Sequence, residues 1–183
     1  MRYLIALTTF GALLAGCATS HSPALYTLDT TPSAQAGSPV NITLGRLRIA
    51  ESLLNKRILV KQSPTEIEYY ATAQWAASLD ELLREKLTAE FGPIDTARPS
   101  FDISGTLQAF EQVDTPSIPE AHVKLALEVR KAGESQYAPA ALSKVYDVSL
   151  PVAEESAGGV VVALSTCLEQ VARAIVADVV ALQ

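Results

Sequence analysis

Apolar and polar residues alternate along much of this chain, and a two-residue period is typical of half-buried β-strands. The alternation predicts a strand over residues 40–49 with a bulge at Gly45, where the apolar positions change parity. A hairpin is predicted over residues 57–70, with its turn at Ser63-Pro64-Thr65. Further strands are expected at residues 101–109, 121–129 and 146–150.

One segment instead carries apolar residues every three to four positions, which is the period of a helix that buries one face. It follows Ser78-Leu79-Asp80-Glu81, a capping box whose hydroxyl and carboxylate satisfy backbone donors at a helix start. Gly92-Pro93 ends the run. A helix over residues 78–91 is therefore predicted, with a start one turn earlier, at Trp75, as the alternative.

A second helix is expected over residues 160–182, after Gly158-Gly159. It is long enough for a membrane span, which needs roughly 20 apolar residues. However, Glu169, Arg173 and Asp178 lie within it, and charges at membrane depth are costly. We therefore interpret it as a core helix packed against a sheet.

The order of predicted elements is strands, helix, three strands, helix. Strands that occur in runs favour antiparallel pairing, and each helix needs a surface on which to bury its apolar face. The pattern therefore predicts a single α+β domain with two helices packed on one face of a mainly antiparallel β-sheet.

The N-terminus has the pattern of a secretory signal over residues 1–16, a positive start followed by a short apolar run. Leu14-Ala15-Gly16-Cys17 resembles the bacterial lipobox. The resemblance implies cleavage before Cys17 and attachment of fatty acyl chains such as palmitate to that residue. Several acyl chains on one residue give stable membrane anchoring. An ordinary cleaved signal is the alternative.

Residues 17–37 are polar and rich in turn-forming residues, which predicts an acylated, flexible tether before a domain over residues 38–183. Within the tether, Leu25-Tyr26-Thr27-Leu28 is expected to form a short strand or a docked segment. Lipoproteins that stay in the inner membrane tend to have Asp after the cysteine. Here Ala18 follows Cys17, so this resemblance favours the periplasmic face of the outer membrane.

Composition excludes several classes of protein. The 183 residues include 14 Lys and Arg against 20 Asp and Glu, a net charge of −6, so the concentrated basic surface of a nucleic-acid-binding protein is not expected. A hydrophobic share of 49% argues against disorder. Two histidines and two cysteines without a short spacing leave little material for a metal site, and no cofactor is expected.

The residues that could carry catalysis are few. His21 lies in the tether, and His122 occupies an outward position of a strand, where a solvated histidine is expected. Cys167 lies two positions off the apolar stripe of the last helix, which predicts a half-buried structural thiol. Two carboxylate pairs are expected to be solvated, Glu66 with Glu68 and Glu154 with Glu155. No enzyme is predicted, and a small hydrolase that depends on His122 is the weakest alternative.

Several features resemble, in order, the ABC-type transport auxiliary lipoproteins, the family that includes PqiC. The matching pieces are the lipobox, Tyr26-Thr27-Leu28, a strand leading to Leu53-Leu54, and Ile58-Leu59-Val60. The most characteristic piece is Glu68-Tyr69-Tyr70 followed by Trp75 before a Leu-rich helix. The family usually has a basic residue before this tryptophan, where this chain has Gln74.

The resemblance implies a non-catalytic accessory subunit of an intermembrane lipid transporter, anchored to the outer membrane and exposed to the periplasm. The implied partners are the membrane, an MCE-domain protein that bridges the periplasm, and the permease and ATPase of the transporter. Self-association into a homo-oligomer is left open. The alternative is a structural or assembly lipoprotein of an envelope or secretion complex that does not handle lipid.

Overall fold

The computed structural model describes residues 22–33, 36–135 and 137–183. The predictions for the signal, the lipobox and His21 lie outside these residues. The elements are β1 (Ala24–Tyr26), β2 (Asn41–Ile49), the 3₁₀ turn η1 (Glu51–Leu53), β3 (Arg57–Ser63), β4 (Glu66–Trp75), α1 (Leu79–Phe91), β5 (Ser100–Val113), β6 (Glu120–Lys131), β7 (Leu142–Pro151) and α2 (Ala157–Val180).

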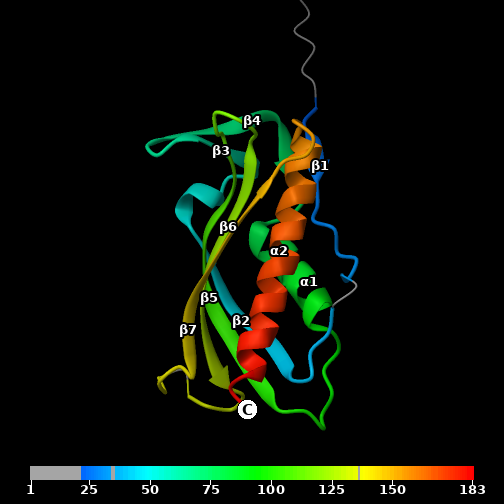
Figure 1. Cartoon of the computed structure of the whole chain (residues 1–183), viewed down its shortest axis with the longest axis vertical. Coiled ribbons are helices and arrows are strands. Elements are labelled where there is room, and N and C mark those ends of the chain that lie inside the picture. The colour runs from blue at the N-terminus through cyan, green and yellow to red at the C-terminus, as the bar shows by residue number, and fades with distance from the viewer. Residues whose placement is uncertain (1–21, 34–35, 136) are drawn as a thin grey trace, which may run out of the picture.

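The seven strands form one sheet in the order β1-β4-β3-β5-β6-β7, and β2 also pairs with β5. One edge of β5 is shared, because its first half pairs in parallel with β2 and its last residues pair in parallel with β3. Its other edge pairs with β6 in an antiparallel ladder, and β6 pairs with β7 in the same way. Figure 1 shows both helices on the same side of this sheet, so the predicted α+β class and layer arrangement are confirmed.

Helix α1 is capped as the sequence predicts. The Ser78 hydroxyl accepts a hydrogen bond from the backbone N–H of Glu81, and the helix ends at Gly92, whose φ is +80°. The alternative start at Trp75 is wrong, because Trp75 is the last residue of β4 and its N–H donates to the carbonyl of Lys56. The Trp75 side chain is buried, and the centroid of its ring lies 5.5 Å from the ring centroid of Phe110.

Helix α2 begins three residues earlier than predicted. The Ser156 hydroxyl caps it by accepting a hydrogen bond from the N–H of Gly159, so both glycines lie in the first turn. A Cβ at Gly159 would overlap the carbonyl oxygen of Glu154. Gly159 therefore allows the loop before the helix to approach closely. The Gly158-Gly159 pair thus lies inside the helix rather than in front of it.

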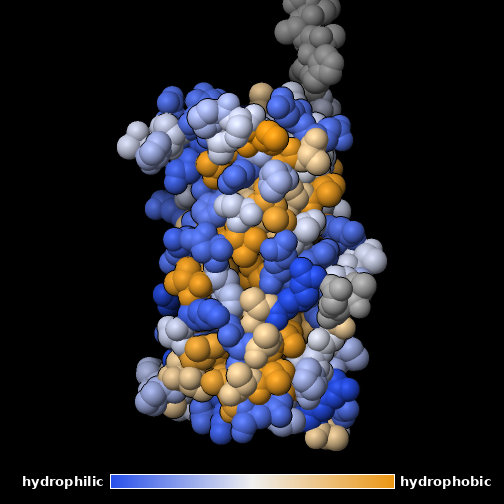
Figure 2. Space-filling model, viewed as in Figure 1, coloured by the Kyte–Doolittle hydropathy of each residue, from blue (hydrophilic) through white to orange (hydrophobic). Residues whose placement is uncertain are grey.

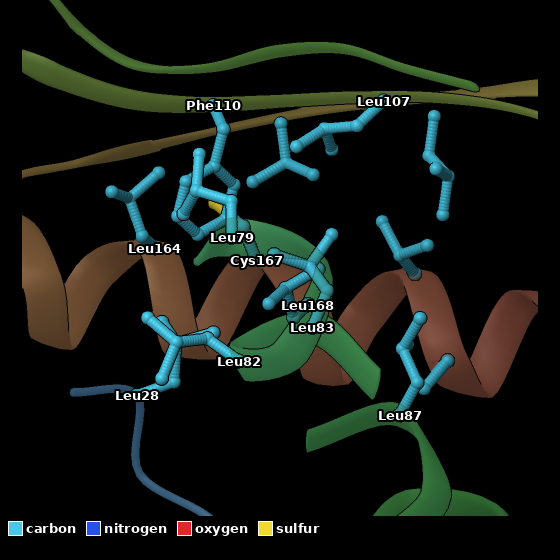
Figure 3. Close-up of a cluster of buried hydrophobic side chains, with 14 of the residues drawn as sticks. Leu28, Leu79, Leu82, Leu83, Leu87, Leu107, Phe110, Leu164, Cys167 and Leu168 are labelled. Carbon is cyan, nitrogen blue, oxygen red and sulfur yellow. The ribbon is translucent and has the colours of Figure 1, made fainter. Parts of the chain in front are cut away.

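The buried stripe of α2 is wider than predicted and includes Cys167, which is fully buried rather than half-buried. Its thiol donates to the carbonyl oxygen of Ala121 at 3.5 Å. Figure 3 shows this part of the core, where Phe110 of the sheet points toward the Leu164 and Cys167 side of α2. The thiol thus lies at the contact between helix and sheet.

Among the described residues, α2 is the one helix that is long and apolar enough to cross a membrane. Within its most apolar window, 56% is buried inside the body, where the helix packs against β6, β7 and α1. In Figure 2, polar residues are interspersed with apolar ones over the face of the molecule that α2 presents. These contacts support the interpretation of α2 as a core helix.

The short strand or docked segment expected at Leu25-Tyr26-Thr27-Leu28 is confirmed, and more of the stretch expected to be a flexible tether also packs on the body. Strand β1 pairs in parallel with the end of β4, with Tyr26 opposite Trp75. Leu28 is buried in the core and lies beside Leu82 of α1 in Figure 3. The backbone N–H of Asp29 donates to the hydroxyl of Ser165. The folded body therefore starts at β1 rather than at residue 38.

Candidate functional site

The two helices cover one face of the sheet. On the opposite face, where the described residues place no helix, the side chains are mainly polar. In the pairing register, Arg48 lies opposite Thr106 of β5, and Thr106 lies opposite Ala126 of β6. A groove of about 620 Å³ follows these positions, within the volume range of small-ligand sites, about 300–1,000 Å³. We call it the arginine groove and define it by Arg46, Arg48, Ser104, Thr106, Glu128, Arg130 and Ser143.

The predicted bulge in β2 determines the positions of the two arginines that this strand contributes to the groove. The pairing with β5 shifts between Leu44 and Leu47, so both leucines are buried while Arg46 and Arg48 both line the groove. The guanidinium of Arg84 on α1 donates to the carbonyl oxygens of Leu44 at 2.8 Å and Gly45 at 3.1 Å. Helix α1 thereby stabilises the bulge that positions the two arginines.

The third arginine of the groove, Arg130, has partners within the protein. Arg130 donates to the carboxylate of Glu128 at 2.8 Å and to the carbonyl of Ala138 at 3.1 Å. Within the described part of the chain, the side chains of Arg46 and Arg48 form neither an ion pair nor a hydrogen bond. The groove therefore carries three positive charges against one negative charge, in a chain whose net charge is −6.

A second cluster lies on the same face, centred on His122. Its Nδ1 lies 3.3 Å from Oε1 of Glu111, and its Nε2 lies 2.8 Å from Oδ1 of Asp147. Lys124 also contacts Asp147, at 2.9 Å. Hydrogen bonding to Glu111, the largest effect, and to Asp147 raises the pKa of His122 above 6.5 in spite of its partial burial. Protonated His122 is thus held between two carboxylates.

The expectation of a solvated His122 is wrong, although its outward position is correct. The side chain is only 19% exposed, and both ring nitrogens face carboxylates. Neither nitrogen is therefore left to accept a proton from Ser149, which lies opposite His122 in the register. The pairing of three strands brings this cluster together, so the spacing of residues along the sequence gives no signal for it.

A third cluster joins the N-terminal segment to both helices. The Nζ atom of Lys86 is fully buried and lies 3.0 Å from Glu90, 2.9 Å from Glu169 and 3.2 Å from the carbonyl of Thr31. Glu90 also accepts hydrogen bonds from the backbone and hydroxyl of Ser33. We call these residues the lysine lock, because they fasten residues 31–33 to α1 and α2.

The sequence-predicted site residues have different outcomes. Leu14, Ala15, Gly16 and Cys17 lie outside the described residues. The carboxylates Glu66, Glu68, Glu154 and Glu155 are exposed, as predicted. Among the described residues, no group of three or more His, Cys, Asp or Glu side chains is arranged so that it could hold a metal ion. Sequence reasoning missed the arginine groove, for which Arg46 and Arg48 on alternate positions beside a predicted bulge were the available signal.

Comparisons with known proteins agree with this fold. The crystal structure of protein XCC0632 from Xanthomonas campestris is similar, with a TM-score of 0.64, 19% sequence identity, and coverage of 84% of this chain and 92% of that chain. A crystal structure of an uncharacterized protein matches with a TM-score of 0.64 at 12% identity, covering 87% and 99% of the two chains. At these identities the likeness concerns the fold alone. No curated protein sequence matches the chain.

The family model described as "ABC-type transport auxiliary lipoprotein component" matches residues 26–176. The match runs from β1 into the last turns of α2, so it includes nearly all of the described body. It also confirms the resemblance on which the sequence interpretation depends. The chain belongs to the family of ABC-type transport auxiliary lipoproteins.

Proposed function

We propose that the protein is a non-catalytic accessory subunit of an ABC/MCE-type intermembrane lipid transport system, anchored to the periplasmic face of the outer membrane through acylated Cys17. The single observation that carries the proposal is the family match over residues 26–176. The coarser statement, an auxiliary lipoprotein component of a transporter, follows directly from that match. The lipid cargo, the MCE partner and the outer membrane are the proposed refinements.

The chemistry of the described body is consistent with a role without catalysis. Both nitrogens of His122 face carboxylates, and burial raises the pKa of the Cys167 thiol to about 12, so neither is prepared to act as base or nucleophile at neutral pH. The arginine groove is lined mainly by charged and hydroxyl side chains. Such a lining suits polar contacts better than an acyl chain, so we assign the body a docking role.

The test is a crosslinked pull-down from native envelopes, extracted in detergent, with a C-terminal tag and mass spectrometry of proteins and lipids. We expect an MCE-domain protein together with phospholipid. Recovery of secretion or outer-membrane assembly factors without an MCE protein would instead support the structural lipoprotein alternative.

The anchor is tested separately by a matched pair of chains, the wild type and Cys17→Ser. Wild-type protein should incorporate labelled palmitate and sediment with outer-membrane vesicles, whereas Cys17→Ser should do neither. Equal labelling of both chains would refute acylation at Cys17, and labelled wild type in inner-membrane fractions would refute the proposed location.

A further inference from the structure

The outer face of the sheet carries two clusters of charged side chains at different points along the strands. The arginine groove occupies one part of it, and the His122 cluster with its carboxylates occupies another. In the register, Glu128 of the groove and His122 lie six residues apart on β6, about 20 Å at the rise of an extended strand. The face is therefore a patterned surface and not a uniformly basic one.

Arg46 and Arg48 are the unusual feature of this surface. Both are exposed, and within the described part of the chain neither guanidinium has a carboxylate partner. They lie two positions apart on one strand and line the same groove, so their charges repel each other. Arg84 satisfies the carbonyl groups of the bulge that holds them there. Two unpaired, positioned guanidinium groups form a ready binding surface for carboxylates.

We propose that the arginine groove binds an acidic segment of a partner protein, with Arg46 and Arg48 as the residues that pair with its carboxylates. The inference rests on the proposed function only in taking that partner to be a component of the transporter. The hydroxyl groups of Ser104, Thr106 and Ser143 line the same groove and are placed to hydrogen-bond the backbone or side chains of the bound segment.

The charge pattern favours a protein segment over a membrane surface as the occupant. An anionic bilayer attracts clusters of several Lys and Arg residues without intervening acids. Here Glu128 lies within the groove, and Glu111 and Asp147 lie farther along the same face. The exposed carboxylates of Glu128 and Asp147 interrupt the basic positions and so weaken the attraction of this face for an anionic leaflet, whereas a peptide can place its own charges to match.

The first experiment measures binding of a labelled ten-residue polyglutamate probe to the mature, acylated protein in a non-ionic detergent. Arg46→Gln/Arg48→Gln should weaken binding about tenfold or more at low salt. The matched control is Lys56→Gln/Arg57→Gln, which removes the same charge from two exposed residues that do not line the groove. The control should change binding less than about twofold. Equal losses in both variants, or no binding by the wild type, would overturn the proposal.

Vesicles of phosphatidylglycerol and inorganic phosphate provide the competing probes. If either binds the wild type in an Arg46- and Arg48-dependent manner while polyglutamate does not, the groove is a lipid-headgroup or phosphate site and the proposal is wrong. Competition between polyglutamate and the vesicles for the same arginines, with polyglutamate bound more tightly, would support it.

The second experiment places a photo-crosslinking amino acid at Ser143 of the full-length protein in cells, followed by sequencing of the crosslinked peptide. We expect an acidic segment of one protein, whose crosslink is lost with Arg48→Glu and restored by Lys substitutions in that segment. Crosslinks to lipid alone, or to a segment without net negative charge, would overturn the inference.

The outcomes also separate this inference from the proposed function. An MCE partner in the pull-down together with no groove crosslink would overturn the groove proposal and leave the transporter role intact. A charge-dependent crosslink to an acidic segment of a protein from outside any transporter would support the groove and overturn the transporter role.

Discussion

The lysine lock offers a test of how a buried ion pair stabilises this fold. In Lys86→Met, the apolar side chain keeps most of the lysine volume, so the packing cost is small. The charge is lost, however, and the Glu90 carboxylate, with a side chain only 1% exposed, keeps only its hydrogen bonds from Ser33. Breaking a buried pair by removing one partner costs about 3–5 kcal/mol.

That cost converts to a fall in Tm of roughly 6–20 °C, since 1 kcal/mol shifts Tm by about 2–4 °C in a domain of this size. Urea and thermal unfolding of the mature protein, followed by circular dichroism, measure both quantities. The matched control is Lys56→Met at an exposed position, which should change the free energy of unfolding by less than about 0.5 kcal/mol. A loss below about 1 kcal/mol in Lys86→Met would refute the reasoning, because the lock would then be worth no more than an exposed pair.

The same variant has a defined pH dependence. Burial raises the pKa of Glu90, but the hydrogen bonds from Ser33 and Lys86 outweigh it, and the pKa lies below the ordinary value of 4.5. A carboxyl group with a lowered folded-state pKa stabilises the protein above its unfolded value and loses that contribution as the pH falls through the folded value. Wild type should therefore lose its advantage over Lys86→Met below about pH 4.5. A constant difference from pH 7 to pH 3 would contradict the assignment.

Three further predictions concern the sheet and its contact with α2. Hydrogen bonding, largely to Glu111, raises the pKa of His122, so charged His122 stabilises the fold fully below pH 6.5 and this stabilisation is lost as the pH rises through the folded-state pKa. In urea titrations, the excess free energy of unfolding of wild type over His122→Phe should therefore shrink toward pH 9. Burial raises the pKa of Cys167 to about 12, so a thiol reagent should label Cys167 in the native protein about a hundredfold more slowly than in the urea-unfolded chain; fast native labelling of Cys167 would contradict this. In Gly105→Ala, the new Cβ would overlap the carbonyl oxygen of Ala126, so unfolding should become easier by about 3 kcal/mol, and an unchanged Tm would show that the strands can separate locally.

The elements were predictable where their signals are local. The capping box at Ser78 and the spacing of the leucines that follow it fix α1, and the parity change at Gly45 reveals the bulge in β2. The start of α2 was missed, because a glycine pair ordinarily weakens a helix and the Ser156 cap precedes it. Local patterns thus identify the elements but misplace several of their ends, such as the end of β5 at Val113 rather than residue 109 and the start of β7 at Leu142 rather than residue 146.

Strand order and the clusters could not be predicted in the same way. The period of a strand shows which face is buried and does not show its neighbour, so the parallel pairing of β3 with β5 carries no sequence signal. The contact of His122 with Glu111 and Asp147 depends on that unknown order, because the three residues come from three strands. The apolar stripe does not include Cys167, which is nevertheless buried because α2 is covered over a wider arc than a helix that buries one face.

The two ends of α2 show how far the arginine groove lies from the proposed anchor. Gly158, at the start of α2, lies beside Tyr26 of β1, and Asp178, near its end, pairs with Lys144, the neighbour of Ser143 in the groove. Twenty helical residues separate these points, about 30 Å along the axis. The seven residues from Cys17 to β1 span at most about 25 Å. An acyl chain on Cys17 would therefore hold the β1 end near the membrane, while the lysine lock keeps the rest of the N-terminal segment on the body. A body standing upright on the membrane would present the groove some 30 Å beyond the β1 end, away from the membrane surface.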